Sequence, residues 1–493
     1  MPAGDQDSAA ARGTDATETP ARISRGTSGQ TRLTAVIVAC ALFMQNLDST
    51  VIATALPTMA RAFGADPVHM NVALTSYLLS LAVFIPASGW MADRFGARTV
   101  FRAAIGVFTA GSMLCGAADS LGFLVVARVL QGMGGAMMVP VGRLVLLRTA
   151  AKSELVGAMA LLAAPALLGP VLGPPLGGLF VTYLSWRWIF FINLPIGILG
   201  MALVTIYVPD ARDPGAARLD GFGLVLSGIA LGSTMFGLET VFRGIVPQFL
   251  SVSLLGLGLA AGALYVRHAR RHTSPLLDLS LMRIPTFMVS VVGGTLFRVG
   301  VGATPYLLPL MLQVGFGNSA LRSGMITLAG SAGAIVMKPA TTRALRWFGF
   351  RDTLLVNGVL SGATLCLCAA FRPDWPAAAI YLVLLTGGFF RSLQFTAYNT
   401  IAYADIPPER MSAATSLYAT LQQVSQSLGV TAGAASLEAT MAAAGRASPG
   451  VGDFAAAFVL VGVVALAAAP VSWLMPRDAG EELSGHHRAV AAD

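Results

Sequence analysis

Charged residues are scarce in this sequence of 493 residues, where Asp, Glu, Lys and Arg together make up 11% of the chain. A soluble domain has about a quarter of its residues charged, because its surface must be hydrated. Hydrophobic residues instead make up 55% of the chain, and the mean hydropathy is +0.71. This balance excludes a water-soluble globular protein and predicts that the apolar excess faces lipid.

Groups that serve catalysis, metal binding or ATP hydrolysis are also few. The 4 cysteines lie within apolar runs without metal-ligand spacing to a histidine, and the 5 histidines lie outside the expected membrane spans or, for His69, at the very start of one. No G-x-x-x-x-G-K-[ST] phosphate loop occurs, and no basic patch alternates with aromatic residues. We therefore expect no enzyme activity, no metal, no cofactor and no nucleic-acid partner. A membrane receptor is also disfavoured, because the loops are too short for a folded extramembrane module.

Long hydrophobic runs fill most of the chain. A membrane span requires about 20 consecutive, mainly apolar residues. Breaks at charge clusters and Pro/Gly turns predict an all-α integral membrane protein with about fourteen transmembrane helices. The expected spans are 33–60, 68–91, 98–117, 121–147, 155–182, 186–208, 219–240, 247–267, 285–314, 319–343, 352–371, 376–402, 410–441 and 453–475.

Basic residues are concentrated in every second connection between these spans. One such connection holds Arg94, Arg98 and Arg102, and another holds Arg143, Arg148 and Lys152, whereas each intervening connection holds a single Arg. Because basic loops stay in the cytoplasm, both termini are expected there and the number of spans is even. Twelve spans remain an alternative. The expected location is the bacterial cytoplasmic (inner) membrane, with 1–32 and 477–493 as disordered cytoplasmic tails.

The chain contains a weak internal repeat. Leu56–Met59 matches Leu308–Met311, Phe95–Arg98 matches Phe348–Arg351, and a Gly-Gly pair at 134–135 matches one at 387–388, all at offsets of 252 or 253. The repeat predicts two six-helix halves, 33–208 and 284–476, around a two-helix linker segment at 209–283. Parallel halves around a central pathway are a transporter layout, in which one half rocks against the other.

The connection after the second span, Gly89–Arg98, is similar to the signature loop of the major facilitator superfamily. The resemblance implies a latch that holds one conformation and releases on rocking, and its residues are Gly89, Asp93, Arg94, Gly96 and Arg98. The alternative is a basic loop that only sets topology. The copy in the second half has Arg346 where Asp93 stands, so a latch role there is doubtful.

Two charged residues lie inside expected spans. Asp48 lies ~22 Å along the first span from Leu33, and Arg128 lies ~10 Å into a span that descends from the other side, so the two are at similar depth. Buried charges in a membrane are costly and therefore functional by default. They are candidates to pair in a proton-linked network, and the alternative is a purely structural ion pair.

The runs that contain these charges resemble one branch of the superfamily. Leu47–Val51 with Leu56-Pro57 resembles the first span of the fourteen-span drug:proton antiporters, and the run from Arg128 to Gly135 resembles their fourth-span motif. The resemblance implies proton coupling by Asp48 and Arg128. An Arg does not release a proton itself, but its charge can favour proton release from a neighbouring carboxylate.

The fifth expected span carries a run of Gly and Pro that resembles the antiporter motif of the same superfamily. Its residues are Gly169, Pro170, Gly173, Pro174, Gly177 and Gly178. Gly allows close helix packing and Pro bends a helix, so the motif is expected to seal a path to protons. The alternative is an ordinary Gly/Pro-rich membrane helix.

Together these features predict a secondary active transporter that exports small amphipathic compounds or drugs by proton antiport. A dedicated transporter of one metabolite, siderophore or self-made antibiotic is the alternative. The expected partners are the small-molecule substrate, protons and the lipid bilayer, with a periplasmic adaptor as a further candidate and a monomer as the working unit. Polar residues deep in the second half are candidates to line the cavity: Arg298, Arg391, Gln394, Asn399 and Gln423.

Overall fold

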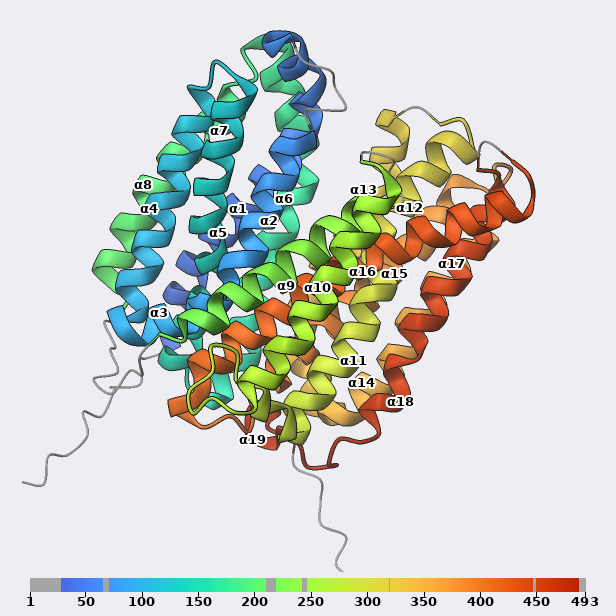
Figure 1. Ribbon diagram of the computed structural model, residues 1–493. Helices are drawn as coiled ribbons and strands as arrows, with labels where there is room; N and C mark the ends of the chain where they lie inside the picture. The colour runs from blue at the N-terminus through green and yellow to red at the C-terminus, as the bar shows by residue number, and fades with distance from the viewer. Residues whose placement is uncertain are drawn as a thin grey trace, which may run out of the picture.

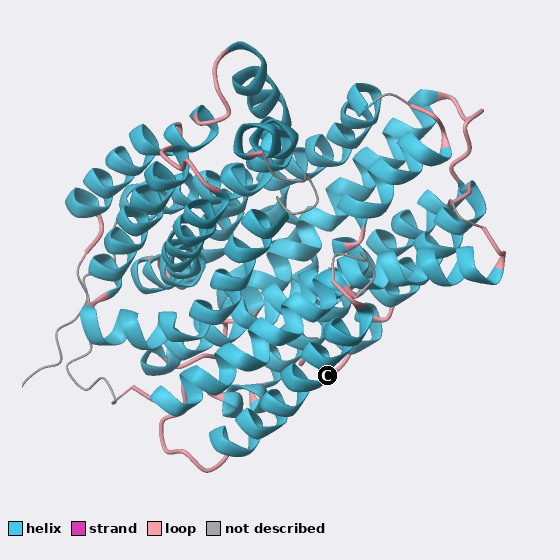
Figure 2. Ribbon diagram, turned by 45° about the horizontal axis from the view of Figure 1, so that its top comes forward, coloured by secondary structure: helices cyan, strands magenta, loops and turns pink. Residues whose placement is uncertain are grey.

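The structure, a computed structural model, describes residues 28–64, 71–209, 219–241, 246–318, 320–446 and 449–486. All regular structure in those ranges is helical (Figure 2). Ten stretches within them are long and apolar enough to cross a membrane. The all-α membrane architecture is as predicted, whereas the count of fourteen spans stays a prediction.

The first group of helices precedes the predicted linker segment. It comprises α1 (Ser28–Phe63), α2 (Asn71–Phe84), α3 (Ser88–Phe95), α4 (Ala97–Gly116), α5 (Leu121–Thr149), α6 (Leu155–Tyr183), α7 (Trp188–Phe191) and α8 (Asn193–Tyr207). Within this group α1 packs along α6, α5 packs against α2 and α4, and α8 covers α4.

The second group follows the linker segment. It comprises α11 (Pro285–Gly302), α12 (Thr304–Leu310), α13 (Ala320–Met337), α14 (Thr341–Leu367), α15 (Ala377–Ile401), α16 (Met411–Ala443), α17 (Val451–Leu466) and α18 (Ala468–Ser472). Here α11 packs along α16, α15 packs against α13 and α14, and α17 covers α14. This packing repeats the packing of the first group helix by helix.

Local geometry repeats at the same offset as the sequence. A short 3₁₀ turn follows α2 at Ile85–Ala87, and another follows α13 at Lys338–Ala340. Gly96 has a φ of 88° and Gly349 a φ of 68°, a left-handed conformation that a residue with a side chain rarely adopts. Each glycine therefore allows a sharp reversal of direction between a loop helix and the next long helix.

Two further helices, α9 (Gly221–Thr240) and α10 (Gln248–Ala269), lie between the groups in the chain. They pack against each other, and α9 also contacts α2 and α16, so the pair lies across the junction of the two groups (Figure 1). In the most apolar window of α10 only 22% of the residues are buried, which fits a helix that faces lipid.

The expected tails are shorter than predicted where the structure describes them. Helix α1 begins at Ser28, so 28–32 are helical. Near the other end a short helix, α19 (Glu481–Ser484), buries Leu483 and packs against α14 and the start of α6. These segments are ordered because they contact the bundle. The remaining tail residues, 1–27 and 487–493, lie outside the described residues.

The two groups meet along a seam formed mainly by α16 with α3 and α5, and by α6 with α13 and α15. At one end of the bundle, which contains α3 and α19, hydrogen bonds join the groups. Ser416 on α16 donates to the carbonyl oxygens of Ile85 and Pro86 at 3.2 and 2.8 Å. Figure 1 shows the ribbons of the two groups diverging toward the opposite end. The structure is therefore held together across the seam at the α3 end.

Candidate functional site

Asp48 and Arg128 form an ion pair in the middle of the first group. Arg128 Nη1 donates to Asp48 Oδ2 at 2.6 Å, and the two residues are 3% and 0% exposed. Asp48 comes from α1 and Arg128 from α5, so the pair ties two helices together. The structure thus brings together the two residues whose similar depth made them candidates to pair.

Two amide side chains complete the environment of the carboxylate. Gln131 donates from Nε2 to Asp48 Oδ1 at 2.9 Å, and Asn193 donates from Nδ2 to the same oxygen at 3.1 Å. Gln131 also accepts from Arg128 Nη1 at 2.7 Å, and the guanidinium group lies 4.3 Å from the centre of the Tyr77 ring. Asp48 is therefore held by three donors in a site closed to solvent, and its charge is fully compensated.

The sequence analysis assigned no role to Gln131, which lies within the run from Arg128 to Gly135, or to Asn193. Gln131 follows Arg128 by three residues on one helix, so the two side chains lie on the same face. That spacing was a signal for Gln131. Asn193 begins α8 and is 145 residues from Asp48 in the chain. The sequence pattern of α8 does not indicate a contact with Asp48.

The Gly/Pro run of α6 packs against α1 two residues from Asp48. A Cβ added at Gly169 would lie 2.8 Å from Asn46 Cβ, and one at Gly173 would lie 2.8 Å from Thr50 Cβ. Thr50 Oγ1 donates to the Gly169 carbonyl oxygen at 3.2 Å across this contact. The close approach expected of the motif therefore occurs at these two glycines.

The other motif residues differ in their surroundings. A Cβ added at Gly178 would meet nothing within 4 Å, so close packing does not explain this glycine. Gly177 is buried, and the side chains of Pro170 and Pro174 lie outside those that the structure describes. A role of the motif in sealing a proton path stays a prediction.

The predicted latch lies at the α3 end of the seam. Asp93 accepts from Arg148 Nη2 at 2.8 Å and from the hydroxyl of Ser412, which belongs to the second group. A Cβ added at Gly89 would lie 2.7 Å from the carbonyl oxygen of Ser412. Gly89 and Asp93 therefore bind the first group to the start of α16.

The remaining latch residues make no described contact between the two groups. Arg98 donates to the carbonyl oxygen of Thr205 at the end of α8, which lies within the first group. Arg94 is exposed, and no partner for it occurs in the described residues. Gly96 supplies the turn between α3 and α4. Arg148, which was assigned only to topology, is the arginine that pairs with Asp93.

The five candidate cavity residues are not brought together, because no hydrogen bond joins any two of them in the described ranges. Gln394 is 0% exposed, accepts from Asn357 and donates to the Leu354 carbonyl, so it links α15 to α14 and does not line a cavity. Asn399 donates to Phe395 of its own helix. Arg391 and Gln423 line two separate small recesses.

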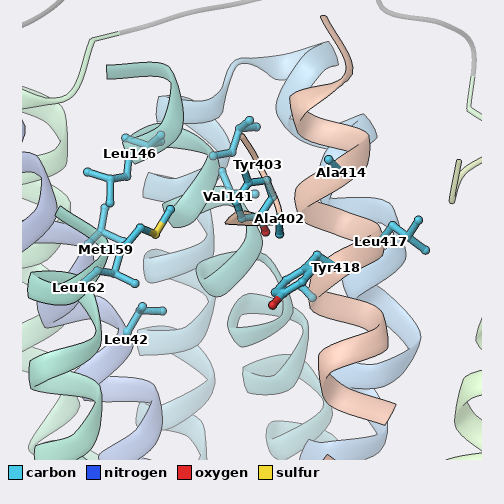
Figure 3. Packing of buried hydrophobic residues seen from close by; sticks show 14 of the residues in the cluster. Leu42, Val141, Leu146, Met159, Leu162, Ala402, Tyr403, Ala414, Leu417 and Tyr418 are labelled. Atoms are coloured by element: carbon cyan, nitrogen blue, oxygen red, sulfur yellow. The ribbon is translucent and has the colours of Figure 1, made fainter. Parts of the chain in front are cut away.

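Arg298 lies near the Tyr418 ring, as does Arg143, a residue that the sequence analysis assigned to a cytoplasmic connection. Arg298 donates to the hydroxyl of Tyr418 on α16. Arg143 of α5 is 4% exposed and donates across the seam to the Tyr403 hydroxyl at 3.2 Å. Figure 3 shows Tyr403 and Tyr418 among the apolar side chains between the helices. The burial of Arg143 corrects its assignment to a basic loop.

Comparison with known proteins agrees with this architecture. Residues 38–430 match the Major Facilitator Superfamily profile. A curated relative from Enterobacter sp. (strain 638), named "Putative multidrug resistance protein MdtD", is 39% identical over 397 residues, which are 80% of this chain and 84% of the relative. The relative of the same name from Klebsiella pneumoniae (strain 342) is 40% identical over 398 residues, with the same coverage.

Solved structures share the fold at low sequence identity. The human organic anion transporter MFSD10 (TETRAN) superposes with a TM-score of 0.65 at 14% identity, covering 90% of this chain and 99% of that one. The proton:xylose symporter XylE, bound to 6-bromo-6-deoxy-D-glucose, superposes with a TM-score of 0.63 at 14% identity, covering 93% and 99%. These likenesses confirm the predicted fold.

Proposed function

Because the chain belongs to the major facilitator superfamily and is a membrane transporter, not an enzyme, we propose that it exports small amphipathic compounds in exchange for protons. The buried Asp48–Arg128 pair carries this proposal. It is the one buried ion pair inside the helices of the first group that the structure describes. The name of the relatives at 39–40% identity supports export of more than one drug.

The network around Asp48 supports a role in proton coupling. As a carboxylate, Asp48 accepts hydrogen bonds from Arg128, Gln131 and Asn193. A proton added to Asp48 removes the charge that balances Arg128, and the charge-assisted hydrogen bond between them weakens. Because the pair joins α1 to α5 and α8 lies beside it, protonation changes how three helices of the first group are held.

The contacts of the seam support a direction for this cycle. We place the α3 end and both chain termini in the cytoplasm, since the basic connections lie at that end. Gly89, Asp93 and Arg143 hold the two groups together there, so the described conformation is closed toward the cytoplasm. Protonation of Asp48 from the outside would then precede opening of the seam inward, where the proton leaves and substrate enters.

The test uses the purified full chain in liposomes with an imposed pH gradient and ethidium as the transported probe. Asp48→Asn removes the titratable group and keeps a similar shape, so we expect pH-gradient-driven ethidium movement to fall to the rate of empty liposomes. Asp119→Asn is the matched control, because the Asp119 side chain is 91% exposed in a surface pair with Arg187. Retained proton-dependent transport by Asp48→Asn would remove Asp48 from the mechanism.

A further inference from the structure

Two buried arginines at the seam have no role in the proposed proton coupling. Arg143 and Arg298 are each 4% exposed. In the part of the chain that the structure describes, no carboxylate lies within ion-pair distance of either. Burying an uncompensated charge is costly. By default such a cation within a membrane protein marks a functional site, for example on a substrate pathway.

Both guanidinium groups converge on one tyrosine of α16. The Cζ atom of Arg143 lies 5.5 Å from the centre of the Tyr418 ring, and that of Arg298 lies 4.9 Å from it. Arg298 also donates to the Tyr418 hydroxyl and lies 5.8 Å from the ring of Phe395. One arginine comes from the first group and the other from the second, so the pair lies at the junction that opens and closes.

The hydrogen-bond acceptors of Arg143 do not compensate its positive charge. It donates to the Tyr403 hydroxyl at 3.2 Å and to Gln422 Oε1 at 3.4 Å, and both acceptors are neutral and belong to the second group. Among the described residues, the Nε atoms of Arg143 and Arg298 have no hydrogen-bond acceptor. When the groups separate at the α3 end, the bonds of Arg143 across the seam break. Charged N–H donors of both arginines are then left without acceptors beside the opened space.

The surroundings of this pair are aromatic. The centres of the Tyr403 and Tyr418 rings lie 5.6 Å apart, and the centre of the Phe287 ring lies 6.2 Å from that of Tyr418. A compound with an apolar body could therefore place that body against these rings while a charged end reaches the two arginines.

We propose that Arg143 and Arg298 bind the carboxylate of an exported compound that also has an apolar body, and that Tyr418 positions Arg298. The planar guanidinium fork matches the two oxygens of a carboxylate, and both charges lie where water is excluded on closure. This inference rests on the proposed export function and adds amphipathic carboxylates as one class among its substrates.

The test compares two probes that differ in charge alone, 1-naphthylacetate and 1-naphthylacetamide. Binding of each to the full chain in phosphatidylcholine nanodiscs is measured by equilibrium dialysis with naphthalene fluorescence. We expect the carboxylate to bind at least about tenfold more tightly than the amide, as one charge-assisted contact provides. Arg143→Gln and Arg298→Gln should each bring the two Kd values within about threefold of each other.

The control is Arg351→Gln. Arg351 also lies near an aromatic ring, that of Trp473 at 5.7 Å, and donates to a carbonyl, but it is far from Tyr418 in the fold. This variant should keep the full preference for the carboxylate. Arg298→Lys keeps the charge and should retain part of the preference, which provides a second reading if a Gln variant does not fold.

Several results would overturn the inference. Equal affinity of the wild type for both probes would do so, as would an undiminished preference in both Gln variants. Displacement of 1-naphthylacetate by added phosphatidylglycerol would assign the arginines to a lipid headgroup instead. Ethidium export without carboxylate preference would overturn this inference and leave the proposed function intact. Carboxylate binding without pH-gradient-driven transport would instead contradict the proposed function.

Discussion

The two groups of helices share a packing pattern but differ in the partners of their buried cations, although Arg143 of the first group resembles the second group in having no carboxylate partner. In the first group, Arg128 is neutralised by Asp48, and the amides of Gln131 and Asn193 complete the site. In the second group, Arg298 and Lys338 are buried and have hydroxyl groups as their acceptors, from Tyr418 and Thr396. The repeat therefore preserves the shape of the bundle while the chemistry of the two groups has diverged.

This difference suggests a division of work between the groups. A compensated ion pair can exchange a proton, because adding one proton to the carboxylate changes the balance of the whole site. An arginine without a carboxylate partner does not exchange a proton, but it can bind an anionic ligand. The first group is thus suited to energy coupling and the second group, together with Arg143, to substrate.

The largest loss of stability is expected when Arg128 is replaced, and it tests the difference between the two groups. Arg128→Leu leaves the Asp48 carboxylate buried without a cation, which costs about 3–5 kcal/mol. Arg298→Leu removes a cation that has no carboxylate, so it should cost less than half as much. The measurement is the apparent unfolding temperature of each purified variant in one detergent.

The double variant Asp48→Asn/Arg128→Leu provides the control. It removes both charges of the pair, so it should recover most of the stability that Arg128→Leu loses. Equal destabilisation by Arg128→Leu and Arg298→Leu would contradict the difference between the two groups, because it would mean that Arg298 is also compensated.

An intermediate effect is expected where the groups touch. Gly89→Ala places a Cβ 2.7 Å from the backbone carbonyl oxygen of Ser412, so the seam cannot close at the α3 end without a shift. Overpacking of this kind costs about 1–3 kcal/mol, which corresponds to about a 5- to 150-fold loss of the closed population. Transport of ethidium should fall, and a cysteine placed at the seam should react faster with a water-soluble thiol reagent.

Gly256→Ala in α10 is the matched control for this prediction, because an added Cβ there meets no described atom within 4 Å. It should leave both the transport rate and the cysteine reactivity at the level of the parent protein. A normal closed population in Gly89→Ala would show that the approach of α3 to α16 does not hold the seam.

The sequence predicted the fold well because lipid imposes simple rules on composition. Hydrophobic runs and alternating basic connections are enough to place helices, and the offset between Phe95–Arg98 and Phe348–Arg351 is enough to predict a repeat. The Asp48–Arg128 pairing followed from depth alone. These features depend on distance along single helices, which a sequence shows directly.

Contacts between helices could not be read in the same way. Arg143 looked like part of a basic loop, because it lies six residues before the end of α5 and near Arg148. Its burial depends on Tyr403 and Gln422, which are more than 250 residues away. For the same reason Gln394 looked like a cavity residue although it binds α14, and Arg98 was counted among the latch residues although it binds α8.

The smallest effect concerns a charge pair outside the membrane, which joins the loop after α10 to the start of α16. Asp278 Oδ2 accepts from Arg410 Nη2 at 2.5 Å, and Oδ1 accepts from the Ser280 hydroxyl at 2.6 Å. Partial burial raises the pKa of Asp278, but these hydrogen bonds and the Arg410 charge outweigh it and hold the pKa below its usual value. The ionised form is therefore favoured in the folded protein.

A lowered pKa means that this pair stabilises the fold above the pKa of an unfolded Asp, about 3.9, and that the stabilisation is lost as pH falls through the lower folded value. Because the pair is partly exposed, it should contribute only about 0.2–1 kcal/mol. Asp278→Asn should thus lower the unfolding temperature slightly at pH 7, and the difference from the parent should shrink at pH 3. A difference that grows on acidification would show that Asp278 is not held as a carboxylate. In that case only charge pairs inside the membrane, such as Asp48–Arg128, would stabilise the fold.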